Sequence, residues 1–239
     1  MTPPSPPTPD PAGPIVGRVR TVLVGPAVPY TRPGSLSGID KQPVTGAATV
    51  AALGLVDDQQ GDLRVHGGPD KAVHAYAWAH YEAWRAELPP NALLAQPGAF
   101  GENLSIDGAD EASVCLGDQW QVGGVLLEVS QGRQPCWKLN DRFGVADMAR
   151  RVQDTGRTGW YLRVLRPGRL SAGDALQLRA RPHPAWPLAR LLAAIRDRVC
   201  EPALLREMLA LPLTPSWRRL FEQRLAAGGA EDWTRRLQG

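Results

Sequence analysis

One stretch of the chain reads Val125-Leu126-Leu127-Glu128-Val129-Ser130-Gln131-Gly132-Arg133-Gln134-Pro135-Cys136-Trp137-Lys138-Leu139-Asn140. Its apolar first half predicts a strand, and a short proline turn after that strand would place the Cys136 sulfur at the mouth of a sheet. A cysteine attacks a substrate or binds a metal as the thiolate, which cationic neighbours such as Arg133 and Lys138 favour. The alternative is that Cys136 is a small buried hydrophobe.

Short β-type runs separated by Gly and Pro turns occur on both sides of this stretch. They lie at residues 15–24, 48–53, 72–78, 103–106, 119–122, 160–165 and 175–179. Two helices are expected between them, at residues 80–88 and 145–153. Many short strands with few helices predict a mainly β fold, a barrel or a sandwich, rather than a doubly wound α/β fold.

The composition changes near residues 181–184, and the chain beyond is rich in Leu, Ala and Arg at helical spacing. Three helices are expected at 187–199, 202–211 and 215–225, each with a proline near its first turn, and Thr214 is the expected N-cap of the third. A short final helical turn is expected within 231–237. The predicted organisation is a disordered proline-rich tail (1–14), a β domain (15–181) and a separate helical domain (185–239).

Length and composition narrow the class of protein. The 239 residues are 43% hydrophobic and 21% charged, typical of a globular protein with one domain and a small appendage. The three widely spaced cysteines indicate no disulfide framework. No signal peptide and no apolar stretch of ~18 residues is visible, so we expect a cytoplasmic protein without membrane association. A net charge of +3 is too small to predict stable nucleic-acid binding.

Lysine is rare in this chain. Of 27 basic residues only Lys41, Lys71 and Lys138 are lysines, and all the others are arginines. A site shaped for the compact lysine ammonium need not accept the planar guanidinium of arginine. The three lysines therefore nominate three segments of the chain, unless their placement is chance.

The first of these segments contains Val65-His66-Gly67-Gly68-Pro69-Asp70-Lys71. Two adjacent glycines allow backbone N–H groups to approach a ligand closely, and such a nest beside a lysine suits an anion. The alternative is a Gly-Pro-Asp hairpin turn with an incidental histidine. The segment is not a nucleotide-binding P-loop, because the GxxxxGK[ST] spacing is absent.

Two further glycine-flanked segments carry polar side chains, at residues 98–104 and 154–160. The first contains Glu102 and Asn103 at the start of an expected strand. A Cys–His hydrolase is one reading of the polar residues, with Cys136, His66 and either Asn103 or Asn140. No feature of the sequence shows that these groups converge, and no oxyanion element is identifiable.

Taken in order, five motifs resemble the MOSC family (the molybdenum cofactor sulfurase C-terminal domain), specifically its YiiM-like branch. They are VHGGPDKAVHAY (65–76), GAFGENLS (98–105), LGDQWQVGG (116–124), EVSQGRQPCWKLN (128–140) and TGRTGWYLRVLRPGRLSAGD (155–174). The resemblance covers about residues 15–239, including a helical C-terminus similar to the three-helix domain of this branch. It implies a MOSC-type β-barrel with a few helices and a small C-terminal helical domain.

The resemblance also implies a function. The family binds the molybdenum cofactor, a pterin with a dithiolene and a phosphate, and its molybdenum-binding cysteine corresponds to Cys136. The implied reaction is the reduction of N-hydroxylated compounds, such as hydroxylaminopurine bases, to amines: two electrons reach the N–OH group and the oxygen leaves as water. The alternative is a non-catalytic cofactor carrier or a sulfur-transfer protein that uses the same cysteine.

Specific residues follow from the motifs as expectations. The expected proton donors are His66, Glu102 and Asp58. The expected cofactor-binding residues are Lys41, His66, Gly67, Gly68, Lys71, Gly101, Asn103, Gln131, Arg133, Lys138 and Asn140. Because the sequence has no flavin, haem or iron–sulfur signature, an external reductase is expected to supply electrons. The C-terminal helices are expected to dock that reductase or to form a homodimer.

Overall fold

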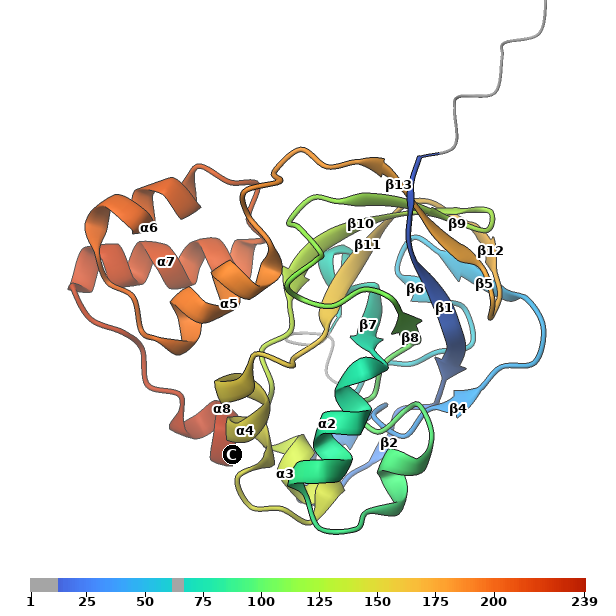
Figure 1. Ribbon diagram of the computed structural model, residues 1–239. Helices are drawn as coiled ribbons and strands as arrows, with labels where there is room; N and C mark the ends of the chain where they lie inside the picture. Colours follow the sequence, from blue (N-terminus) through green and yellow to red (C-terminus); the bar gives the residue numbers. More distant parts are fainter. Residues whose placement is uncertain (1–12, 62–66) are drawn as a thin grey trace, which may run out of the picture.

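The computed structural model describes residues 13–61 and 67–239. A β-barrel forms the centre of the molecule, and three C-terminal helices lie together beside it (Figure 1). Further helices lie below the barrel in the same view.

Seven strands close into the barrel. Their order around it is β13-β9-β10-β11-β7-β8-β1, and β13 pairs back with β1. Every neighbouring pair is antiparallel except β7 and β8. The bounds are β1 (Ile15–Val24), β7 (Val73–Ala77), β8 (Leu104–Asp107), β9 (Gln119–Val122), β10 (Val125–Gly132), β11 (Trp160–Arg166) and β13 (Ala175–Ala180). The expected mainly β fold is confirmed, in its barrel form.

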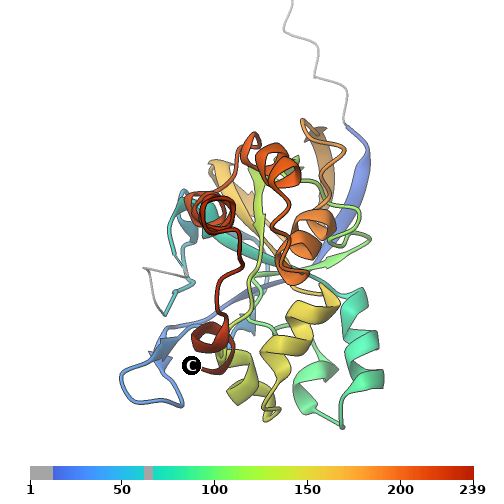
Figure 2. The ribbon, with the colours of Figure 1, turned by 90° about the vertical axis from the view of Figure 1, so that its left-hand side faces the viewer.

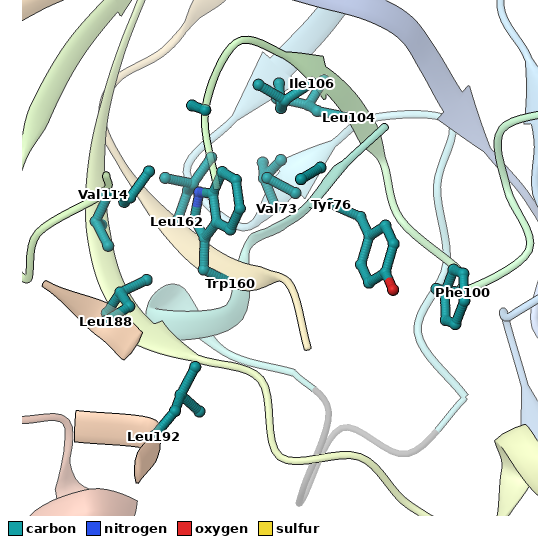
Figure 3. Packing of buried hydrophobic residues seen from close by; sticks show 14 of the residues in the cluster. Val73, Tyr76, Phe100, Leu104, Ile106, Val114, Trp160, Leu162, Leu188 and Leu192 are labelled. Atoms are coloured by element: carbon teal, nitrogen blue, oxygen red, sulfur yellow. The ribbon is translucent and has the colours of Figure 1, made fainter. Parts of the chain in front are cut away.

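The barrel is filled by the alternating side chains of its strands. In β10, Val125, Leu127 and Val129 are buried while the residues between them are partly exposed, the period of two that a strand imposes. These side chains join a continuous core, and Figure 3 shows the indole of Trp160 beside Leu162 in that core. Each such fully buried apolar side chain contributes about 1.5–3 kcal/mol to folding.

Short strands complete the sheet structure. Strands β2 (Val28–Pro29) and β3 (Leu36–Ser37) form a small hairpin. Strand β4 (Gln42–Pro43) extends the barrel sheet beside the end of β1. A three-stranded sheet contains β12 (Gly168–Leu170), β5 (Ala48–Ala51) and β6 (Gly54–Leu55). The chain between β3 and β4 provides one wall of the cavity described below.

Helices α2 (Ala79–Glu87), α3 (Lys138–Phe143) and α4 (Met148–Thr155) and two short 3₁₀ helices, η1 (Pro69–Lys71) and η2 (Ala92–Ala95), connect the strands. The helix expected at 80–88 is confirmed within one residue at each end. The helix expected at 145–153 begins at Met148 instead. Helix α3 was not expected, because its six residues are too few to show a helical period.

The C-terminal region contains α5 (Leu188–Arg196), α6 (Pro202–Leu209) and α7 (Pro215–Ala227), which confirms the three expected helices. Thr214 accepts a hydrogen bond from the Trp217 N–H and is the N-cap of α7, as predicted. The unit packs closely on the barrel: a Cβ atom on Gly132 of β10 would lie 2.8 Å from the Leu192 side chain of α5. Glycine at this position therefore permits the contact.

A last helix, α8 (Thr234–Gln238), leaves the three-helix unit. It lies beside α3 and α4 below the barrel, as both ribbon views show (Figures 1 and 2). The expected final helical turn is therefore present, but it packs on the β domain, and the C-terminal region is not a separate unit along its whole length. No helix among residues 13–61 and 67–239 combines the length and the apolar character needed to cross a membrane.

Candidate functional site

A cavity brings together segments that are far apart in the sequence. Eight of the expected site residues line it: Lys41, Asp58, Lys71, Gly101, Asn103, Arg133, Cys136 and Lys138. The other lining residues are Ser37, Gly38, Ile39, Gln59, Gln60, Gly61, His74, Phe100 and Tyr161. The three rare lysines, selected on composition alone, therefore meet in one place.

Cys136 lies in the short connection between β10 and α3. Its side chain is partly exposed and lines the cavity, whereas Cys115 is buried at 3% exposure. The Leu139 N–H donates to the Cys136 carbonyl at 3.0 Å, so the backbone turns into α3 directly at the cysteine. The structure thus supports the exposed, cavity-facing interpretation of Cys136 over the buried hydrophobe.

Arg133 is a buried cation in the lining of the cavity. Its backbone N–H donates to the Gly159 carbonyl at 2.9 Å, which fixes it at the end of β10 beside β11. The residue is only 6% exposed, and among the described residues Nη1 has no hydrogen-bond partner. A buried donor without an acceptor is costly for a protein, and an anion in the cavity would remove that cost.

Two aromatic rings lie near this cation. The rings of His74 (β7) and Tyr161 (β11) are cross-strand neighbours with centroids 5.2 Å apart, and Lys71 Nζ lies 5.8 Å from the Tyr161 ring centroid. Burial lowers the pKa of His74 well below its usual value, and the charge of Arg133 lowers it further. Burial also raises the pKa of Tyr161, against the opposing effect of Arg133. At neutral pH the cavity therefore contains a neutral imidazole and a phenol O–H donor.

Burial similarly lowers the pKa of Lys71, and the negative charge of Asp70 opposes this effect. Asp70 itself is held in place by two contacts with the barrel. Its carboxylate accepts a 3.0 Å hydrogen bond from Arg163, and its carbonyl accepts one of 2.5 Å from Ser130 Oγ. These contacts anchor η1, whose last residue is Lys71, to strands β10 and β11.

An ion pair and an amide form the opposite wall. The Lys41 ammonium pairs with the Asp58 carboxylate, and both side chains are 5% exposed. The carboxylate also accepts hydrogen bonds from the Gly25 N–H (2.9 Å) and from the Asn103 side-chain amide (2.8 Å). Asn103 accepts in turn from the His74 N–H at 3.0 Å. Burial lowers the pKa of Lys41, and Asp58 acts in the opposite direction.

Gly101 allows the loop before β8 to pass close to this wall. Its φ of +73° lies in the left-handed region that favours glycine, and a Cβ atom would come within 2.8 Å of Ile39 Cγ1. Any larger residue would push Ile39 into the cavity or the loop away from it.

Lys138 lines the cavity, but its ammonium is hydrogen-bonded to another part of the protein. Nζ donates a 2.6 Å hydrogen bond to the Leu36 carbonyl of β3. Tyr30 of the same hairpin segment donates through its hydroxyl to the Lys138 carbonyl at 3.0 Å. Lys138 therefore holds the β2–β3 hairpin over the cysteine segment.

Three expected site residues lie elsewhere. Glu102 is fully buried and accepts hydrogen bonds from Tyr81 and from the Gly98 and Phe100 N–H groups, so it shapes the 98–103 loop. Gln131 accepts from Thr214 at 2.8 Å and joins β10 to α7. Asn140 donates to the Leu237 carbonyl at 2.7 Å and joins α3 to α8. In each case the polar side chain is used to hold two parts of the fold together.

The double-glycine segment is only partly described. Gly67 and Gly68 do not line the main cavity, although Gly68 borders a neighbouring cavity that shares Asp58 with it. His66, expected as a proton donor and cofactor-binding residue, lies outside the described residues. The alternative interpretation, a Gly-Pro-Asp hairpin turn, is not observed: Pro69–Lys71 form the 3₁₀ helix η1. Of residues 67–71, Lys71 is the one that lines the main cavity.

Sequence reasoning missed His74 and Tyr161. Both lie in runs correctly expected to be strands, where a polar aromatic residue among apolar neighbours was the available signal. It also missed Arg236 of α8, whose guanidinium donates a 2.6 Å hydrogen bond to the Pro135 carbonyl. No local pattern connects residue 236 with residue 135.

The side chains present fit a cofactor that combines a metal with an anionic group. A cysteine thiolate is a soft ligand suited to a thiophilic metal, and the buried guanidinium with an unpartnered Nη1 suits the anion. Within residues 13–61 and 67–239, no three His, Cys, Asp or Glu side chains gather into a metal site.

The fold and the site define a β-barrel protein with a cysteine-containing cavity and a helical C-terminal module. The MOSC domain family model matches residues 62–177, and the model of the YiiM-like, 3-alpha helix domain matches residues 186–228. Protein YiiM of Escherichia coli (strain K12) is 39% identical over 206 residues, which cover 86% of this chain and 92% of that protein. The chain belongs to the MOSC family, in its YiiM-like branch.

Two further similarities are informative. The crystal structure of YiiM from Escherichia coli superposes with a TM-score of 0.77 at 34% identity, covering 93% of this chain and 99% of that one. A protein of Gibberella moniliformis (strain M3125 / FGSC 7600) named "Reductase" is 40% identical over 190 residues. That match covers 79% of this chain but only 34% of the fungal protein.

Proposed function

We propose that this protein is a molybdenum-cofactor-dependent reductase that converts N-hydroxylated compounds, of the hydroxylaminopurine type, to amines. The observation that carries the proposal is the presence in one cavity of Cys136 and of Arg133, whose buried Nη1 has no hydrogen-bond partner within residues 13–61 and 67–239. Membership of the MOSC family supports the cofactor, and the fungal relative named "Reductase" supports the direction of the chemistry.

The side chains of the cavity divide into two roles toward such a cofactor. Cys136 would bind the molybdenum through its sulfur. Arg133 and Lys71, both cationic and both in the cavity lining, would bind the phosphate of the pterin. Gly101 lets the 98–103 loop lie against Ile39, and both residues are part of the cavity lining that would surround the pterin. When bound, the cofactor supplies the two electrons that break the N–O bond.

The reaction R–NHOH + 2e⁻ + 2H⁺ → R–NH₂ + H₂O also consumes protons. Of the three expected proton donors, Asp58 is the one that lines the described cavity, where it pairs with Lys41. Because burial lowers the pKa of Lys41, its ammonium releases a proton more readily than an exposed lysine does. We assign proton delivery to this pair. Electrons would arrive from a separate reductase.

The experiment is expression in a host that makes the molybdenum cofactor, followed by metal and pterin analysis and an assay of amine formation from a hydroxylaminopurine. Cys136→Ala should lose molybdenum and activity. The matched control is Cys200→Ala, which removes another partly exposed thiol, located in the helical unit.

Three outcomes contradict the proposal. If Cys136→Ala retains molybdenum and full activity, the cysteine is not the ligand. If the wild-type protein binds the cofactor but forms no amine with any reductant, the protein is a cofactor carrier. A protein free of molybdenum that carries a persulfide on Cys136 is a sulfur-transfer protein.

A further inference from the structure

The peptide groups on both sides of Cys136 are hydrogen-bonded to one residue at the far end of the chain. The Arg236 guanidinium donates to the Pro135 carbonyl at 2.6 Å, and the Arg236 carbonyl accepts from the Trp137 N–H at 2.8 Å. Residues 135 and 236 are 101 positions apart. The backbone of the cysteine is therefore held from outside the barrel by α8.

Arg236 is itself well anchored. Its second guanidinium nitrogen donates to Gln153 of α4, and the next residue accepts a 2.7 Å hydrogen bond from Asn140 of α3 through the Leu237 carbonyl. The Leu237 side chain is 2% exposed. Helix α8 is thus bonded to α3, to α4 and to the connection that contains the cysteine.

Arg236 also brings a positive charge to the cysteine segment. Burial lowers the pKa of Arg236 to about 10, and the Coulombic effects of Cys136 and Glu231 oppose that shift. The guanidinium therefore remains charged at neutral pH. This cation comes from residues 234–238, beyond the part of the chain that the 3-alpha helix domain model matches.

We propose that Arg236 is the positioning residue for Cys136: by binding the peptide groups before and after the cysteine, it holds the thiolate in the direction required for metal binding. The inference rests on the proposed function, because it takes Cys136 as the metal ligand. Helix α8 thereby has a role in positioning the cysteine, whereas the three-helix unit α5–α7 packs on the barrel. Without the Arg236 side chain, the connection between β10 and α3 keeps the main-chain bond from the Trp137 N–H and the Asn140 bond, but loses the bond to the Pro135 carbonyl.

The test compares the wild type with Arg236→Ala, Arg236→Lys and Arg235→Ala in the full-length protein. Arg235 is an exposed neighbour on the same helix and serves as the matched control. Two measurements are needed. The first is amide hydrogen exchange of peptides covering 135–140 in cofactor-free protein, with 119–129 of β9 and β10 as an internal reference. The second, on protein loaded with cofactor, is X-ray absorption at molybdenum, which reports the cysteine sulfur, together with the pterin content.

Arg236→Ala should raise exchange in 135–140 by roughly tenfold, the effect of losing one charge-assisted hydrogen bond, while 119–129 stays unchanged. The pterin should be retained and the cysteine–molybdenum signal should fall. Arg236→Lys keeps the positive charge and a hydrogen-bond donor, so its exchange at 135–140 and its cysteine–molybdenum signal should lie between those of the wild type and of Arg236→Ala. If the alanine variant does not fold, Arg236→Lys replaces it in the test. Arg235→Ala should match the wild type.

Three results would overturn the proposal: wild-type exchange and wild-type cysteine ligation in Arg236→Ala, an equal rise in exchange across the reference strands, or the same effects in Arg235→Ala. The failure of the proposed function is a different result, namely wild-type protein without molybdenum. In that case the hydrogen-exchange comparison in cofactor-free protein still decides whether Arg236 holds the cysteine segment.

Discussion

The side-chain amide of Asn103 donates a 2.8 Å hydrogen bond to Oδ2 of Asp58, 45 positions earlier in the chain. The same amide accepts from the backbone of His74, so a neutral residue connects strand β7 to the Lys41–Asp58 ion pair. The neighbouring residue, Glu102, accepts hydrogen bonds from the Gly98 and Phe100 N–H groups and so holds its own loop. One wall of the cavity therefore depends on a chain of contacts in which only Lys41 and Asp58 are charged.

Breaking the ion pair of this wall should lower the free energy of unfolding strongly. Asp58→Asn leaves the buried Lys41 ammonium without its counter-ion, which we expect to cost about 3–5 kcal/mol of the free energy of unfolding. Urea denaturation measures this cost. The control is Asp107→Asn, which breaks the half-exposed pair with Arg20 and should cost about 0–1 kcal/mol. Equal effects of the two variants would mean that the Lys41–Asp58 pair is not buried.

Arg133 should matter for cofactor binding and not for stability. Because its Nη1 is buried without a partner among the described residues, Arg133→Met should change the free energy of unfolding of cofactor-free protein by less than about 1 kcal/mol or raise it. The pterin content after expression should fall at least about tenfold, since a hydrogen bond between charged groups is lost.

The contrasting variant is Arg142→Met. The Arg142 guanidinium donates to the Ala99 and Gly98 carbonyls at 2.8 and 3.2 Å and holds the loop beside the cavity. Its loss should lower the free energy of unfolding by about 1–3 kcal/mol. A destabilised Arg133→Met protein with normal pterin content would reverse the assignment of the two arginines.

Gly101 should not tolerate a methyl group. Gly101→Ala combines a positive φ with a contact of 2.8 Å to Ile39, and we expect a loss of about 1–3 kcal/mol from backbone strain, increased by the clash, together with reduced pterin content. Gly144→Ala is the matched control, since its φ is +65° and nothing lies within 4 Å of the added Cβ. Thermal unfolding measures the backbone strain in both variants. Pterin fluorescence should fall in Gly101→Ala, where the strain lies at the cavity wall, and should stay unchanged in Gly144→Ala.

The helical unit should lose stability in acid through Glu231. Burial alone would raise the pKa of this carboxyl, but hydrogen bonds from Arg224 and Trp233 lower it to about 2. Because the pKa is 4.5 in the unfolded chain, the stabilisation is complete above that pH and is lost as the pH falls from 4.5 through about 2.

The variant Glu231→Gln tests this linkage. It should cost about 2 kcal/mol at pH 7, and its stability should converge with that of the wild type near pH 2. Glu207→Gln removes an exposed carboxylate 3.6 Å from Arg190 and should have little effect at either pH. A difference between Glu231→Gln and the wild type that stays constant with pH would contradict the linkage.

Much of the fold follows from local patterns. Strand β9 was expected with its observed bounds, Gln119–Val122, because a glycine turn follows an alternating run there. Helices α6 and α7 begin at Pro202 and Pro215 as expected, since proline at the first helical position lacks only an N–H that the helix does not use. Helix α3 has only six residues and shows no period, so it was visible only in the structure.

The sequence by itself determined a mainly β fold, the three-helix unit and the choice of Cys136, because period, turn residues and rare lysines are local properties of the chain; the barrel form was implied by the resemblance of its motifs to the MOSC family. Only the tertiary structure decided which polar residues face the cavity. Glu102 and Asn103 are adjacent in the loop before β8, yet Glu102 bonds within its own loop whereas Asn103 bonds to Asp58, 45 positions earlier, and only the fold decides this difference. The approach of Arg236 to the cysteine segment likewise requires the complete fold, because it depends on where α8 packs after the three-helix unit ends.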